Sequence, residues 1–155
     1  MFRKILIAVD ESSCSERAGR VGLAFAKKLN AQVVATHVMK APPTYWGLAA
    51  PSDTMKRHAQ EILEPWALLG QQMQLDLHTE PMHDEDIAEG IVYLANRSQC
   101  DLIVMGMHGR EGLGRMLLGS VAEGVAHHAP VPLLLVRPVP AASDENQAGA
   151  EAAQA

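Results

Sequence analysis

Short apolar runs that alternate with helix-like stretches are the feature that most restricts the fold of this 155-residue chain. Residues 5–9, 102–105 and 133–136 are apolar throughout, as is typical of strands buried on both faces of a parallel sheet. Residues 32–39 form a run rich in β-branched residues, and residues 75–79 form a weaker, alternating run that suits a sheet edge. Together these segments predict five strands.

Helical periodicity fills the intervals between the predicted strands. The first helix opens on a capping-box pattern at Ser13 and Glu16. Its inward side is predicted to carry four apolar residues, which are Ala18, Val21, Phe25 and Leu29. Residues 42–51, which contain several prolines, predict a long and irregular connection after the second strand.

Three further helices follow along the chain. Ser52 or Asp53 starts the second helix, in which Pro65 predicts a kink or a break. Residues 84–97 predict the third helix and residues 121–128 the fourth. Five strands that alternate with four helices predict an α/β fold with an open, doubly wound parallel sheet, helices on both faces and Rossmann-like topology.

The topology predicts where a ligand would bind. In doubly wound sheets, ligands bind beyond the carboxyl ends of the strands, where the strand order reverses. With the order 3-2-1-4-5, the reversal lies between the first and fourth strands. Asp10 ends the first strand and Gly106 ends the fourth, so we expect these two residues to face one crevice.

A glycine-rich segment follows the fourth strand and leads to the last helix. Gly106, Gly109, Gly119 and Ser120 suit the binding of phosphate by backbone N–H groups at a helix start. Two alternatives stay open: the glycines serve only as turn formers, and Ser120 with Glu123 forms a second capping box.

Other side chains near this segment have equally open roles. Arg110 and Arg115 can pair with phosphate or lie solvated in a loop, and His108 can donate to a phosphate oxygen or be an exposed loop residue. The spacing from Gly109 to Gly114 resembles that of a Walker A loop, but Arg115 stands where that motif needs Lys. A phosphate site of another kind is therefore predicted.

Composition excludes several classes of function. The net charge of −5, with Lys and Arg scattered, argues against a nucleic-acid or membrane surface. No apolar run is long enough for a signal peptide or a membrane span. The two cysteines have neither metal-ligand spacing nor a disulfide pattern, which favours a reducing cytoplasm.

Three segments together resemble the universal stress protein family. They are the pattern Gly-x2-Gly-x9-Gly-Ser from Gly106 to Ser120, the first strand with Asp10, and residues 131–136. The resemblance runs from about Phe2 to Pro138. It implies a small cytoplasmic homodimer that pairs through its C-terminal strand, and the glycine pattern marks the ATP-binding subclass.

The resemblance also implies roles for individual residues. Ala8, Val9 and Asp10 would contact adenine and ribose, and Val38 would line the base. The ribose and α-phosphate side would be held by Met105, Gly106, His108 and Gly109. The terminal phosphates would contact Gly119, Ser120 and Val121. ATP, AMP or ADP is the implied ligand, and whether Mg²⁺ accompanies it stays open.

Residues 1–139 are expected to form the nucleotide-binding domain, and residues 140–155, rich in alanine, a flexible tail. Three functions remain open. The first is a regulatory, nucleotide-binding homodimer of the stress response. The others are a dimeric scaffold or signalling protein that binds no nucleotide, and an ATPase with weak turnover.

Overall fold

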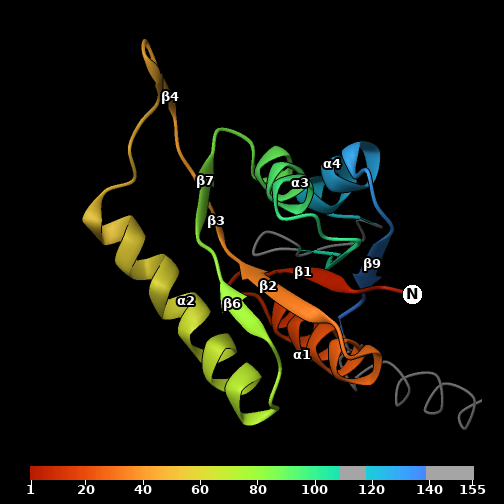
Figure 1. Cartoon of the computed structure of the whole chain (residues 1–155). Coiled ribbons are helices and arrows are strands. Elements are labelled where there is room, and N and C mark those ends of the chain that lie inside the picture. The colour runs from red at the N-terminus through yellow and green to blue at the C-terminus, as the bar shows by residue number, and fades with distance from the viewer. Residues whose placement is uncertain (109–117, 139–155) are drawn as a thin grey trace, which may run out of the picture.

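The computed structural model, which describes residues 1–108 and 118–138, contains a five-stranded parallel sheet (Figure 1). The strand order is β6-β2-β1-β8-β9. The strand bounds are β1 Lys4–Ala8, β2 Gln32–Thr36, β6 Leu77–Thr79, β8 Leu102–Gly106 and β9 Leu133–Val136. The predicted α/β fold and its 3-2-1-4-5 order are confirmed.

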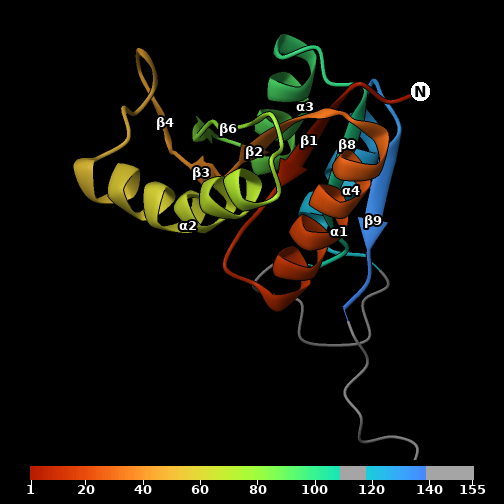
Figure 2. The same cartoon turned by 60° about the horizontal axis from the view of Figure 1, so that its bottom comes forward.

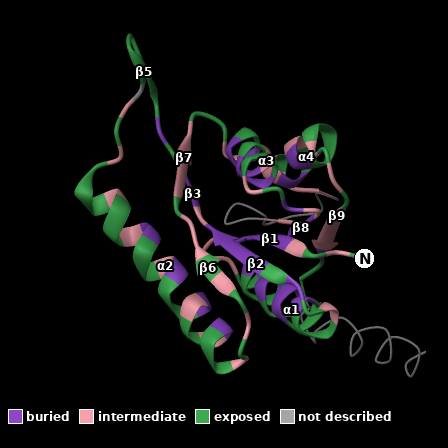
Figure 3. Ribbon diagram, in the orientation of Figure 1, coloured by how far each residue is buried: buried purple, intermediate pink, exposed green. Residues whose placement is uncertain are grey.

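Two helices cover each face of this sheet, which gives three layers (Figures 1 and 2). The bounds are α1 Ser13–Leu29, α2 Asp53–Gln72, α3 Ile87–Arg97 and α4 Ser120–His128. Side chains of α1 and α2 share one buried cluster, and those of α3 and α4 share the other. β1 and β8 lie between the two clusters, and every residue of β8 is buried (Figure 3).

The inward face of α1 differs from the predicted face. Its buried residues are Cys14, Ser15, Ala18, Gly19, Gly22, Leu23 and Ala26, whereas Val21 and Phe25 are each 37% exposed. Small residues face the sheet because α1 packs closely against it: a Cβ at Gly22 would lie 2.7 Å from Ile7. Ala18 is buried as predicted and Leu29 packs against the core, so the predicted apolar stripe is wrong at Val21 and Phe25.

The helix starts also refine the predictions. α1 is capped by Ser12, whose Oγ accepts from the Ser15 N–H, so the capping box predicted at Ser13 is wrong by one residue. Ser52 caps α2 as predicted, and α2 runs unbroken through Pro65, so the predicted break is absent. α3 starts at Ile87 after an Asp86 cap, because the preceding residues form a strand.

Two small strand pairs extend beyond the main sheet. β3 (Val38–Lys40) pairs in parallel with β7 (Met82–Asp84), so His37 interrupts the single run predicted over residues 32–39. The connection predicted to be irregular contains an antiparallel hairpin of β4 (Pro43–Thr44) and β5 (Gly47–Leu48).

The two edges of the sheet are less buried than its centre. β6 lies at one edge, as predicted, and β9 lies at the other. Leu133, Leu134 and Leu135 are only partly buried, so the prediction that β9 is covered on both faces is wrong within this single chain. Among residues 1–108 and 118–138, no helix is long and apolar enough to cross a membrane. The predicted tail at residues 140–155 lies outside the described part of the chain.

Candidate functional site

The strand order reverses between β1 and β8, which pair in parallel with Ile7 opposite Val104. Their carboxyl ends therefore lie at the same edge of the sheet. Asp10 follows β1 and Gly106 ends β8, and the first turns of α1 and α4 start from the same edge (Figure 2). The predicted convergence of these segments is thus present.

Asp10 is held in a compact network of hydrogen bonds at the start of α1. Its Oδ1 accepts from the Ser12 N–H at 2.8 Å, and its own N–H donates to Ser15 Oγ at 2.7 Å. Ser15 is 4% exposed, so its hydroxyl fixes this loop from within. Asp10 therefore holds the turn before α1 together, and its carboxylate is partly buried at the end of β1.

Gly106 lies where the first turn of α1 packs closely against the end of β8. A Cβ at Gly106 would lie 3.0 Å from Cys14 Sγ and 3.2 Å from the backbone N of Ser15. Cys14 Sγ also donates to the Val136 carbonyl at 3.2 Å. The glycine thus lets the first turn of α1 pack against the ends of β8 and β9, which brings a helix N-terminus to the crevice.

The start of α4 differs from those of the other three helices. Side chains of Ser12, Ser52 and Asp86 cap α1, α2 and α3, whereas the N-cap of α4 is Gly119, without a side-chain cap in the described structure. Ser120 is the first residue of α4 and is exposed, so the predicted capping box of Ser120 and Glu123 is wrong. First-turn N–H groups of a helix lack intrahelical acceptors, and among residues 1–108 and 118–138 no side chain accepts from those of α4.

A backbone hydrogen bond ties this helix start to the end of β8. The Gly119 N–H donates to the Met107 carbonyl at 2.8 Å, and the Met107 N–H donates to the Val136 carbonyl at 2.9 Å. The uncapped turn of α4 is therefore held at a defined position beside the ends of β8 and β9.

His108 carries an unsatisfied polar atom at this edge. Its Nδ1 is buried and has no hydrogen-bond partner within the described structure. An unpaired buried polar group costs about 1–3 kcal/mol. A ligand oxygen at this edge would relieve that cost.

The remaining predicted residues occupy different environments. Ala8, Val9 and Met105 are 9%, 5% and 6% exposed and lie at the carboxyl ends of β1 and β8. Val38 belongs to the same core cluster as Ala8, but it begins β3 and lies against α3 near Gly90. Val121 is partly buried in the first turn of α4. Gly109, Arg110 and Arg115 lie outside the described residues.

Two histidines, His37 and His58, connect α2 with the residues that follow β1. Neither was singled out from the sequence. His37 Nδ1 lies 3.0 Å from the Val9 carbonyl, and the His37 and His58 rings meet edge to face at 6.3 Å between centroids. His58 Nε2 lies 3.4 Å from Glu11 Oε2. His37 directly follows a strand, which is a usable signal, but His58 requires knowing that α2 crosses this edge.

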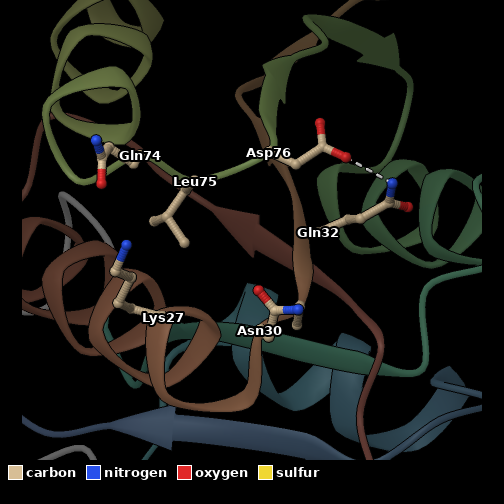
Figure 4. A pocket seen from close by; sticks show the side chains of 7 residues that line it. Lys27, Asn30, Gln32, Gln74, Leu75 and Asp76 are labelled. Carbon is tan, nitrogen blue, oxygen red and sulfur yellow. Dashed lines mark hydrogen bonds between the residues drawn. The ribbon is translucent and has the colours of Figure 1, made fainter.

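A groove of about 760 Å³ extends from Asp10 along α1 and α2. A second cavity, of about 290 Å³, lies at the opposite end of the strands (Figure 4). Its lining includes Lys27, Gln32 and Asp76, and Gln32 Nε2 donates to Asp76 Oδ2 at 2.6 Å. This second cavity is therefore remote from the residues that the sequence predicted.

Metal-ligating side chains do not gather in the described residues: no group of three or more His, Cys, Asp or Glu side chains suited to a metal ion occurs there. Glu123 is exposed in the first turn of α4. The chemistry on offer at the crevice is therefore that of backbone N–H groups, His108 and the Asp10 carboxylate.

Comparison with known proteins gives matches that span most of the chain. The sequence profile of the universal stress protein family matches residues 1–137. A universal stress protein of Methanocaldococcus jannaschii is 36% identical over 143 residues, which cover 88% of this chain and 83% of that protein.

Solved structures share the fold. The universal stress protein from Archaeoglobus fulgidus in complex with dAMP superposes with a TM-score of 0.67 at 21% identity, covering 86% of this chain and 97% of that one. An Arabidopsis thaliana family protein with AMP bound gives a TM-score of 0.64 at 17% identity, covering 94% and 99%. At these identities, the likeness concerns the fold.

Proposed function

The chain belongs to the universal stress protein family, and we propose that it binds an adenine nucleotide in the crevice between the ends of β1 and β8. The observation that carries this proposal is the uncapped first turn of α4, anchored to β8 through Gly119 and Met107. An uncapped helix N-terminus favours an anion through its free N–H groups and its dipole. The dAMP and AMP complexes of two solved relatives support the same ligand class.

The crevice offers different chemistry at its two sides. Asp10 is an acceptor for ribose hydroxyls, and buried Ala8 and Val9 provide an apolar floor for the base. The Ser120 hydroxyl and the backbone N–H groups of Ser120 and Val121 in the first turn of α4 provide donors for phosphate. His108 Nδ1 would gain a partner from a phosphate or ribose oxygen. These residues suit a nucleotide whose base lies toward β1 and whose phosphates lie toward α4.

We infer that binding, not turnover, is the main function. Asp10 Oδ1 is already engaged by the Ser12 N–H, and Glu123 is exposed on α4, so neither is held as a base that activates water. Nucleotide binding would join the first turns of α1 and α4 across the crevice. We therefore propose a cytoplasmic, stress-response regulator that binds ATP or AMP and acts as a homodimer through β9.

The proposal is tested by removing one backbone donor without disturbing the helix. Ser120→Pro removes the N–H at the first helical position, where proline is tolerated, and the extended Gly119 backbone (ψ 154°) suits a following proline. Ser120→Ala removes only the hydroxyl. Calorimetry with ATP and with AMP is expected to show about tenfold or greater weakening for Ser120→Pro and a smaller effect for Ser120→Ala.

Asp53→Pro is the matched control, because Asp53 is the first residue of α2 and Ser52 is likewise extended (ψ 160°). It should leave nucleotide affinity unchanged. Equal affinity of wild type and Ser120→Pro would contradict phosphate binding at α4. Absence of binding by the wild type at millimolar nucleotide would instead favour a scaffold that binds no nucleotide.

A further inference from the structure

The β4–β5 hairpin carries two aromatic side chains at its tip. Tyr45 and Trp46 connect the two strands and are 98% and 95% exposed. Thr44 Oγ1 donates to the Gly47 carbonyl at 2.7 Å, which closes the turn, and Gly47 adopts φ 119°, which favours glycine. The exposed rings are thus presented by a closed turn.

The segment around this tip, residues 41–52, contains no charged residue although the chain has a net charge of −5. We call this segment the aromatic arm. It projects away from α2 and from the sheet in both views (Figures 1 and 2). Exposed Trp and Tyr on an uncharged projection are typical of a contact surface, because these side chains are enriched in binding hot spots.

The same chain also contains a groove with apolar side chains that suit an aromatic tip. It is the 760 Å³ groove described above. We call it the α1–α2 groove. Its apolar lining comes from α2 and consists of Ile62, Pro65, Trp66, Leu68 and Leu69. Leu68 is 53% exposed, so the groove presents apolar surface to solvent.

We propose that the aromatic arm of one chain seats Trp46 in the α1–α2 groove of a second copy, which returns the same contact. The arm points away from the α2 of its own chain (Figure 1), so the partner for its tip is a groove on another copy. An arm and a groove on each chain make a self-complementary pair under two-fold symmetry.

The area of this contact is sufficient for a stable dimer. Tyr and Trp each bury about 150–250 Å², so each arm tip removes about 300–500 Å² and its groove a similar amount. Two reciprocal contacts therefore bury about 1,200–2,000 Å², which is the standard range for specific interfaces.

Charge favours the same pairing. The arm brings no charged group to the groove, and two of the carboxylates that line the groove have partners within the chain: Glu16 lies 3.1 Å from Arg20, and Glu11 lies 3.4 Å from His58. The arm and α2 lie on the side of the molecule opposite β9 (Figures 1 and 2). The arm contact is therefore separate from β9 pairing.

Sedimentation velocity over a range of concentrations tests the contact. Trp46→Ser and Leu68→Glu, one in the arm and one in the groove, should each weaken the same association step at least about tenfold. Tyr93→Ser is the control, because Tyr93 is 54% exposed on α3, away from both surfaces. It should leave the association step unchanged.

A mixture of the two variants gives a sharper test. The Leu68→Glu chain keeps an intact arm and the Trp46→Ser chain keeps an intact groove, so an equimolar mixture should associate more strongly than either variant alone. Failure of the mixture to associate more strongly, or identical sedimentation of Trp46→Ser and wild type, would overturn the proposal. A blue shift of Trp46 fluorescence on phosphatidylcholine vesicles, unaffected by Leu68→Glu, would overturn it in favour of a membrane contact.

Discussion

At the scale of single residues, burial determines how the two cysteines behave. Cys14 and Cys100 are each 4% exposed, and neither forms a disulfide. Burial raises the pKa of the Cys100 thiol to about 11, an effect that the nearby Lys4 charge partly offsets. The reactive form of cysteine is the thiolate, so Cys100 is a packed, unreactive residue at neutral pH.

The raised pKa of Cys100 predicts a loss of stability at alkaline pH. The unfolded thiol ionises near 9.0 and the folded thiol near 11, so the unfolded state releases its proton first as pH rises. This stabilisation is complete below pH 9 and is lost between pH 9 and 11. Urea unfolding should show wild type losing up to about 1.4 kcal/mol per pH unit relative to Cys100→Ala in that window. Parallel pH profiles for the two proteins would contradict the prediction.

Single residues also show what a sequence pattern cannot decide. Ser13 and Ser120 both stand three residues before a glutamate, yet the N-caps are Ser12 and Gly119. The turn in which the Asp10 carboxylate accepts from the Ser12 N–H determines the start of α1. The bond from Gly119 to Met107 determines the start of α4.

At the scale of elements, glycine and alanine determine how closely the helices pack. α3 and α4 approach each other so closely that a Cβ at Gly124 would lie 2.7 Å from the Cβ of Ala88. Periodicity alone emphasised large residues such as Val21 and Phe25, which are both 37% exposed. The small residues that face the sheet could not be recognised from apolar periodicity, because their contribution is close approach, not buried area.

The α3–α4 contact predicts a compensating pair of substitutions. Gly124→Ala is expected to destabilise the fold by about 1–3 kcal/mol through overpacking, although alanine is the better helix former by about 1 kcal/mol. The double variant Ala88→Gly, Gly124→Ala removes the clash. Urea unfolding of the four proteins should give a favourable coupling energy of at least about 0.5 kcal/mol. Additive effects would show that the helices adjust without a clash.

At the scale of the whole molecule, the alternation of strands and helices was sufficient to predict the sheet order and its switch point. It placed Asp10 and Gly106 at one edge, where they are found, because the ends of parallel strands meet at the same edge. It did not predict the approach of His58 to Glu11, since this depends on how α2 lies across the sheet. Nor did it predict a hairpin in residues 42–51, whose two-residue turn contains neither Asn nor Gly.

The hydrogen-bond pattern of β9 gives a test of the proposed homodimer. Ile103 N–H donates to Pro132 O and Met107 N–H to Val136 O. Along a strand, the backbone N–H and C=O groups of successive residues point to opposite sides. Those of Leu134 therefore point to β8, whereas those of Leu135 point to the open edge. Leu135→Pro removes an outward donor and keeps the bonds to β8. We expect this variant to lose the β9 interface, so that the mass measured by light scattering falls from that of a dimer to that of a monomer.

Leu134→Pro is the matched control, because its N–H faces β8 and proline there breaks a ladder bond inside the fold. It should lower the midpoint of thermal unfolding more than Leu135→Pro does. If Leu135→Pro keeps both its folded far-ultraviolet spectrum and the wild-type mass, pairing through β9 is wrong. The partly buried leucines of this edge would then need another cover, since an open apolar strand edge is an aggregation site.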